Sequence, residues 1–170
     1  MRSIILLFML FISYHGMAQV DSTACACCTP EHRLFDFWVG DWTVYDTSGT
    51  VMGENLIQVL EDGCILNERW VGSQGSTGRS YNYYHRADST WNQLWIDNSG
   101  NPLILKGTGS PGQMILQSEL IPGQRIDLYR NRITWTLQED GTVTQVWDIL
   151  DKTDNVLQTV FYGIYRKKKR

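Results

Sequence analysis

The sequence predicts an all-β protein of one domain, an antiparallel barrel of about 8–10 strands preceded by one short N-terminal helix. A chain of 170 residues is long enough for one hydrophobic core. Its segments rich in β-branched and aromatic residues have the period of two that is typical of strands. Turn-forming groups such as Asp46-Thr47-Ser48-Gly49 and Glu139-Asp140-Gly141 separate these segments. Closing such a meander into a barrel removes the exposed strand edges.

Residues 1–18 have the pattern of a signal peptide. Arg2 supplies a positive start, the run from Ile4 to Ile12 is apolar, and the small residues Gly16 and Ala18 have the spacing for cleavage before Gln19. This run is too short to cross a bilayer, which needs about 20 apolar residues, so we expect no transmembrane segment. We therefore predict an exported protein, periplasmic or extracellular.

Residues 19–29 form a Cys-rich N-terminal segment. Cys25, Cys27 and Cys28 lie close together in it, whereas Cys64 stands alone. Export permits disulfides, and a bridge to Cys64 would pin the start of the chain onto the barrel wall. Three connectivities stay open, although the adjacent Cys27 and Cys28 can pair only with strain. The alternative is a thiolate cluster for copper(I) or zinc, but no partner histidine has a recognisable metal-site spacing, and we predict no metal.

The folded domain is predicted to span residues 30–166. Thr29-Pro30-Glu31 has the features of a helix start, and Leu34, Phe37 and Trp38 recur at helical spacing before Gly40. After Gly40 the chain shows no second helix, linker or repeat.

Composition and charge exclude several classes of protein. The 15 glycines, four prolines and many aromatic residues exclude collagen and a disordered chain. A net charge of −3 is too small for general nucleic-acid binding, so we expect no nucleic-acid partner. Arg166 to Arg170 are all basic. We interpret residues 167–170 as a solvated basic tail, with binding to an anionic surface as the alternative.

Four predicted strands repeat a polar residue two positions before an aromatic residue. Residues i and i+2 share one face of a strand, so each pair presents a polar tip beside a ring. The pairs are Glu68 and Trp70, Asn82 and Tyr84, Gln93 and Trp95, and Gln145 and Trp147, with Asp97 extending the third pair. If they face inward, they line a ligand pocket with apolar walls and a few fixed polar groups. The alternative is an internal hydrogen-bond network without a ligand.

No catalytic motif stands out in the sequence. His32 and His85 begin no nucleophile–base motif, and there is no G-x-S-x-G, H-E-x-x-H or phosphate-binding glycine loop. Glu68 or Asp97 could serve as a general acid or base in the pocket, which keeps an enzyme as an alternative. The catalytic residues of such an enzyme stay unassigned, and the sequence favours a binding protein.

One segment resembles a known family of barrels. Phe35 to Trp42 (F-D-F-W-V-G-D-W) places Gly-x-Trp directly after a short helix and at the start of the first strand. This resembles the opening of lipocalins and the wider calycin-type barrels. In that family the tryptophan plugs the closed end and an arginine of the last strand stacks over it. The resemblance implies these barrel-closing roles for Trp42 and Arg166.

More closely, the chain resembles a family of exported bacterial proteins of unknown function with a lipocalin-like barrel. The matching pieces lie within residues 31–167 and include Gly63 to Glu68, Ser80 to Tyr84, Trp91 to Asp97, Ile133 to Thr136, Gln145 to Trp147 and Phe161 to Tyr165.

From the predicted barrel and its pocket we predict a carrier of a small apolar or amphipathic molecule, acting as a monomer or weak homodimer. The resemblance brings no established activity with it and informs the fold more than the function. We expect no cofactor, because ten-stranded relatives that bind haem use a late histidine and none follows His85 here. A structural or assembly module with a solid core is a further alternative.

Overall fold

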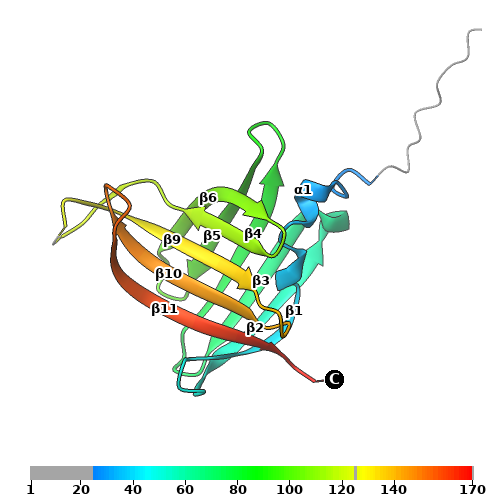
Figure 1. Ribbon diagram of the computed structural model, residues 1–170, viewed down its shortest axis with the longest axis horizontal. Helices are drawn as coiled ribbons and strands as arrows, with labels where there is room; N and C mark the ends of the chain where they lie inside the picture. Colours follow the sequence, from blue (N-terminus) through cyan, green and yellow to red (C-terminus); the bar gives the residue numbers. More distant parts are fainter. Residues whose placement is uncertain (1–24, 125, 170) are drawn as a thin grey trace, which may run out of the picture.

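The computed structural model describes residues 25–124 and 126–169, which form a closed antiparallel β-barrel (Figure 1). The predicted signal peptide, residues 1–18, lies outside the described residues. The strands are β1 (Gly40–Tyr45), β2 (Val51–Leu60), β3 (Ile65–Gly72), β4 (Thr77–His85), β5 (Thr90–Asp97), β6 (Pro102–Ser110), β7 (Gln113–Gln117), β8 (Ile121–Pro122), β9 (Leu128–Leu137), β10 (Val143–Asp151) and β11 (Val156–Lys167).

Ten of these strands close the barrel. Neighbours in sequence pair with each other from β1 to β7, β9 pairs with β7 and β10, and β11 pairs with β10 and β1. The two-residue β8 pairs with the start of β9. The predicted all-β class and the count of about 8–10 strands are therefore confirmed.

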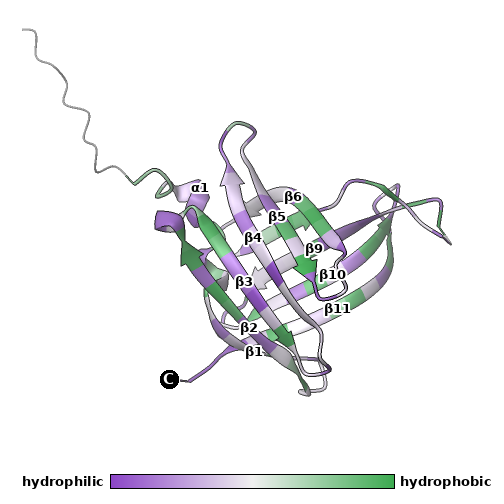
Figure 2. Ribbon diagram, turned by 180° about the vertical axis from the view of Figure 1, so that it is seen from behind, coloured by the Kyte–Doolittle hydropathy of each residue, from purple (hydrophilic) through white to green (hydrophobic). Residues whose placement is uncertain are grey.

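Residues that alternate in the sequence of a strand face alternately the inside and the outside of the barrel. Along β9, Asn131, Ile133 and Trp135 are buried and alternate with half-buried residues. The hydropathy colours in Figure 2 likewise change repeatedly along the strands. The outer face is not uniformly polar, because the register neighbours Leu94 and Ile104 are both exposed on β5 and β6.

A short helical segment precedes the barrel, as predicted. It consists of α1 (Pro30–Arg33) and the 3-10 turn η1 (Asp36–Trp38), and a second 3-10 turn, η2 (Glu61–Gly63), joins β2 to β3. Leu34 and Phe35 separate α1 from η1. Phe35 has a φ of −103° and a ψ of 3°, outside helical values, and its ring is completely buried. The helical segment is therefore interrupted at the residue whose ring packs against the barrel.

This helical segment covers one end of the barrel, which we call the closed end. The ring of Phe35 stacks on Trp38 with centroids 4.9 Å apart, and Trp38 lies 5.3 Å from the ring of Trp135. The indole Nε1 of Trp42 donates to the Trp38 carbonyl over 2.8 Å. These side chains are fully or almost fully buried, so aromatic packing forms the core of the closed end.

Two disulfides hold the start of the described chain. Cys25 bonds to Cys28, and Cys27 bonds to Cys64 directly after η2. The Arg33 guanidinium reinforces the second link by donating to the Gly63 carbonyl. The expected bridge to Cys64 is therefore present, and all four cysteines are paired.

The predicted contact of Arg166 with Trp42 is wrong by one residue. The β1–β11 register pairs Trp42 with Lys167, and the Lys167 ammonium lies 5.2 Å from the centre of the Trp42 ring. Arg166 pairs with Thr43 and lies 4.9 Å from the ring centre of Tyr45. Successive strand residues face opposite sides, so a shift of one position changes which cation reaches the tryptophan.

The predicted boundary between the barrel and the basic tail also differs in the structure. Lys167 is the last residue of β11, and the Lys168 ammonium lies 3.1 Å from Asp41 Oδ1 and 3.0 Å from Glu54 Oε2. Lys167 thus belongs to the barrel wall, and ion pairs attach Lys168 to it.

Candidate functional site

The barrel interior contains a cavity of about 410 Å³ toward the end opposite the helical segment. We call this the open end, because the β1–β2 and β3–β4 turns contribute to the cavity lining there. The lining consists of Asp46, Thr50, Val51, Met52, Glu68, Trp70, Ser73, Gln74, Ser76, Gln93, Trp95, Leu103, Ile133, Trp135, Gln145, Trp147, Phe161 and Tyr165. A cavity of this size is in the range of small-molecule sites.

Six aromatic rings from five strands line the cavity. They belong to Trp70, Trp95, Trp135, Trp147, Phe161 and Tyr165. Trp70 and Phe161 meet edge to face with centroids 6.1 Å apart. The indole of Trp147 donates to Asn131 Oδ1 over 2.9 Å, and that of Trp70 donates to Ser76 Oγ over 3.3 Å. These hydrogen bonds fix the orientation of two wall rings.

A glycine makes room for another wall ring. Gly78 on β4 pairs with Asp97 on β5, which lies two residues after Trp95 on the same strand face. A Cβ atom at Gly78 would collide with the Trp95 ring. The indole therefore packs directly over the glycine backbone. The close approach of the Trp95 ring explains why a glycine occurs within this pair of strands.

A buried carboxyl group is among the polar residues of the cavity lining. The Glu68 side chain is only 5% exposed. Its Oε1 accepts from Asn55 Nδ2 over 2.7 Å, and its Oε2 accepts from Ser80 Oγ over 2.6 Å. Burial raises the pKa of Glu68 to about 7, although both hydrogen bonds act in the opposite direction.

Hydrogen bonds connect Glu68 to a network of polar side chains on both sides of β3. On one side, Gln93 Nε2 donates to Asn82 Oδ1 and Asn82 Nδ2 donates to Ser80 Oγ, each over 2.8 Å. On the other side, Asn55 Nδ2 also lies 3.3 Å from the Tyr165 hydroxyl, which donates to Gln145 Oε1.

The pKa of Tyr165 is raised in this network. Burial first, and the neighbouring Glu68 second, raise the pKa of its phenol well above the ordinary value. The phenol is therefore a neutral hydrogen-bond donor at physiological pH.

The structure brings six of the nine proposed ligand-binding residues to the cavity. These are Glu68, Trp70, Gln93, Trp95, Gln145 and Trp147. Asn82 lies behind them and supports Ser80 and Gln93 by hydrogen bonds. Tyr84 instead lies toward the closed end, with its ring 5.0 Å from that of His32.

Asp97 does not join the cavity lining. Its carboxylate accepts from the backbone N and the hydroxyl of Ser99 in the β5–β6 turn, over 2.9 Å and 2.5 Å. It lines a different hollow of about 460 Å³ together with Arg69 and Arg79. The structure therefore does not form the pair of carboxylates, Glu68 and Asp97, that catalysis in the pocket could use.

Sequence reasoning missed several residues of the site. Asn55 and Ser80 hold the carboxyl group, and Tyr165 and Trp135 add to the lining. Ser80 shares a strand face with Asn82, so extending the polar pattern by two residues would have found it. No comparable local signal marks Asn55 or Tyr165.

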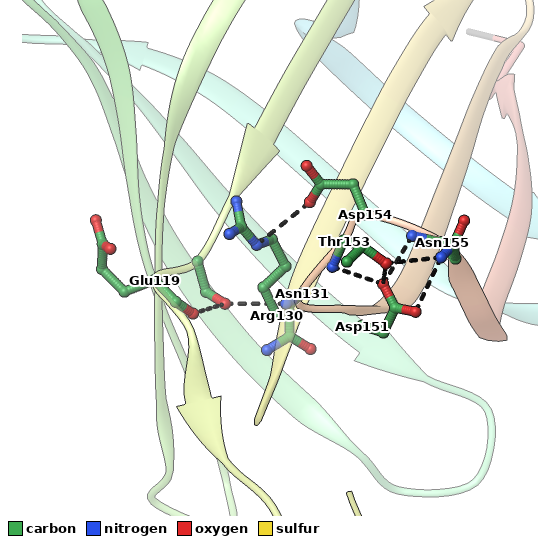
Figure 3. A network of polar contacts seen from close by, with 8 residues as sticks. Glu119, Arg130, Asn131, Asp151, Thr153, Asp154 and Asn155 are labelled. Carbon is green, nitrogen blue, oxygen red and sulfur yellow. Dashed lines mark hydrogen bonds and ion pairs between the residues drawn. The ribbon is translucent and has the colours of Figure 1, made fainter. Parts of the chain in front are cut away.

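A polar network also shapes the open end beyond the cavity (Figure 3). Asp151 accepts hydrogen bonds from Thr153 and Asn155 and so holds the β10–β11 turn. Arg130 Nε forms an ion pair with Asp154 Oδ1 in this turn, at 3.4 Å. The turn is thereby attached to β9.

Within residues 25–124 and 126–169, no three His, Cys, Asp or Glu side chains come together as a metal site. The His32 ring, the histidine nearest the cysteine group in sequence, shares a hydrogen bond of 2.8 Å with Thr29 Oγ1. None of the described helices is long and apolar enough to span a membrane.

The chain matches no protein-family model and no curated protein. The resemblance to an exported bacterial family thus has no family match behind it. The closed antiparallel barrel is consistent with a calycin-like fold.

Proposed function

We propose that the protein is an exported, lipocalin-like carrier that holds a small apolar or amphipathic molecule in its barrel. The observation that carries this proposal is the aromatic cavity of about 410 Å³, lined deep inside by polar side chains. A structural module would gain more from a filled core, because empty space in a protein interior lowers stability. The cavity therefore supports a carrier over a module with a solid core.

The two disulfides support export, because such bonds form and persist in oxidising compartments. We propose cleavage after residue 18 and a periplasmic or extracellular carrier that is a monomer or weak homodimer. Native mass spectrometry of protein purified from its own host should reveal a co-purifying small molecule and the number of protein copies.

A direct test uses the neutral fluorescent molecule N-phenyl-1-naphthylamine, called the neutral probe below, and two substitutions on β6. Leu103 lines the cavity, whereas its neighbour Ile104 is 67% exposed on the outer face. Leu103→Trp should fill part of the cavity and weaken binding of the neutral probe at least tenfold. Ile104→Trp adds the same bulk outside and should leave the affinity unchanged.

Both variants should keep the wild-type circular dichroism spectrum, which shows that the barrel is intact. Equal affinities for Leu103→Trp and wild type would place the probe outside the barrel and contradict the proposal. Absence of binding to the wild-type protein would do the same.

Catalysis by Glu68 is a second candidate function, favoured by its pKa of about 7 inside a cavity. An enzyme would convert the co-purified molecule during incubation, and Glu68→Gln would abolish the conversion. A carrier would return the molecule chemically unchanged.

A further inference from the structure

We propose that the ligand carries a cationic head group, a protonated amine or a quaternary ammonium, which lies beside Glu68 between the aromatic rings of the cavity. This inference rests on the proposed carrier function and names the chemical class of its ligand.

The charges of the cavity lining all have one sign. Among the described residues that line it, Asp46 at the β1–β2 turn and Glu68 deep inside are acidic, and none is Lys, Arg or His. The Asp46 carboxylate is held by the Ser48 and Thr50 backbone N atoms, over 2.8 Å and 2.9 Å. A charged ligand finds an opposite charge in this cavity only if it is a cation.

Glu68 also lacks a cationic partner within the described part of the chain. Asn55 on β2 and Ser80 on β4 donate to its carboxyl group, and Tyr165 on β11 and Gln145 on β10 follow next in the hydrogen-bond network. All four are uncharged, and the phenol of Tyr165 is the one titratable group among them. A buried carboxylate without an opposite charge is costly, and a bound cation would relieve that cost.

The carboxyl group keeps capacity for a ligand. Each oxygen accepts one hydrogen bond from the protein, from Asn55 or from Ser80. An ionised carboxylate has about four acceptor positions, so both oxygens can accept more. An ammonium group supplies the required donors, and a quaternary ammonium supplies the charge without them.

The walls of the cavity suit a cation as well. The faces of tryptophan, tyrosine and phenylalanine rings attract cations, and six such rings line this cavity. The N–H donors of Trp70 and Trp147 are occupied by Ser76 and Asn131, whereas the buried N–H of Trp135 has no hydrogen-bond partner among the described residues. No positively charged donor accompanies it in the described part of the lining. Arg130 at the open end is held by Asp154 (Figure 3).

The test compares three ligands of similar size by isothermal titration calorimetry at pH 8: 4-phenylbutylamine, 4-phenylbutan-1-ol and 4-phenylbutyrate. We expect the amine to bind wild-type protein at least tenfold more tightly than the alcohol, and the carboxylate to bind more weakly than both. Glu68→Gln should bring the amine and the alcohol to within twofold of each other. The control Glu54→Gln removes an exposed carboxylate one residue from Asn55 on the same strand and should keep the full preference.

A second measurement needs no variant. Ionisation of Glu68 changes about tenfold between pH 6 and pH 8 for a pKa of about 7, whereas the amine stays protonated throughout. The amine should therefore bind wild-type protein about tenfold more weakly at pH 6 than at pH 8. The affinity for the alcohol should stay constant.

Three results would overturn the inference: equal affinities for amine and alcohol, a preference for the carboxylate, or a preference for the amine that survives Glu68→Gln. If these results occur while the neutral probe still binds in the cavity, the carrier function stands and only the cationic ligand is refuted. If neither the probe nor any of the three ligands binds, the carrier function itself is refuted.

Discussion

Glu68 links the stability of the barrel to pH. Its pKa is about 7 in the folded protein, against 4.5 for an exposed glutamate. Folding therefore favours the protonated carboxyl group, so Glu68 does not lower the free energy of unfolding below pH 4.5. As pH rises through 7, the buried group ionises at a cost, and the free energy of unfolding falls by up to about 3 kcal/mol.

We expect Glu68→Gln to remove this pH dependence. Glutamine has nearly the same shape, its oxygen can accept from Asn55, and its amide can donate to Ser80 Oγ. The free energy of unfolding of the variant, relative to wild type, should rise by up to about 3 kcal/mol between pH 4 and pH 8. Urea unfolding of both proteins across this range measures the difference.

The matched control for this prediction is Glu54→Gln on the outer face of β2, whose relative stability should change little over the same range. A Glu68→Gln curve parallel to that of wild type would show that the carboxyl group is not buried as described.

At the scale of the elements, strand alternation was predictable and strand register was not. The pattern in Gln93 and Trp95 predicted that both share one strand face, and both line the cavity, because a period of two depends only on neighbouring residues. The partner of Trp42 depends instead on how β1 aligns with β11, more than 110 residues later in the chain. A shift of one position replaced Arg166 by Lys167.

The same reason explains which parts of the candidate site the sequence could predict. Glu68 and its strand neighbour Trp70 were found from a local pattern. Asn55 and Tyr165 lie 110 residues apart in sequence and meet only because β2 and β11 close the barrel on either side of β1. A site assembled by barrel closure needs the register of several strand pairs, which local patterns do not contain.

The segment before α1 and the β2–β3 connection are held together by the Cys27–Cys64 disulfide, which spans 37 residues. In the chain-entropy model, a bond that closes a loop of this length stabilises the fold by about 4 kcal/mol, whereas a loop of four residues gives about 2 kcal/mol. We expect the double variant Cys27→Ser/Cys64→Ser to lose more stability than Cys25→Ser/Cys28→Ser, as measured by urea unfolding under oxidising conditions. The reverse order would mean that the local Cys25–Cys28 loop, rather than the link to the barrel, stabilises this segment.

At the scale of the whole molecule, the two ends of the barrel have different physical characters. The closed end is filled by rings such as Phe35, Trp38 and Trp42, which are completely buried. The open end keeps a cavity whose wall includes the half-buried Trp147. Stability should therefore depend mainly on the closed end and ligand binding mainly on the open end.

Two tryptophan substitutions test this separation. Trp42→Ala removes a fully buried ring and its hydrogen bond to Trp38, so it should lower the free energy of unfolding by about 3–5 kcal/mol. Its affinity for the neutral probe should stay within twofold of wild type, because Trp42 does not line the cavity. Trp147→Ala should weaken probe binding at least fivefold and lose less stability, since this ring is only partly buried. Urea unfolding and fluorescence titration of both variants measure the two effects, and equal losses of stability and affinity in the two proteins would show that the ends of the barrel are not independent.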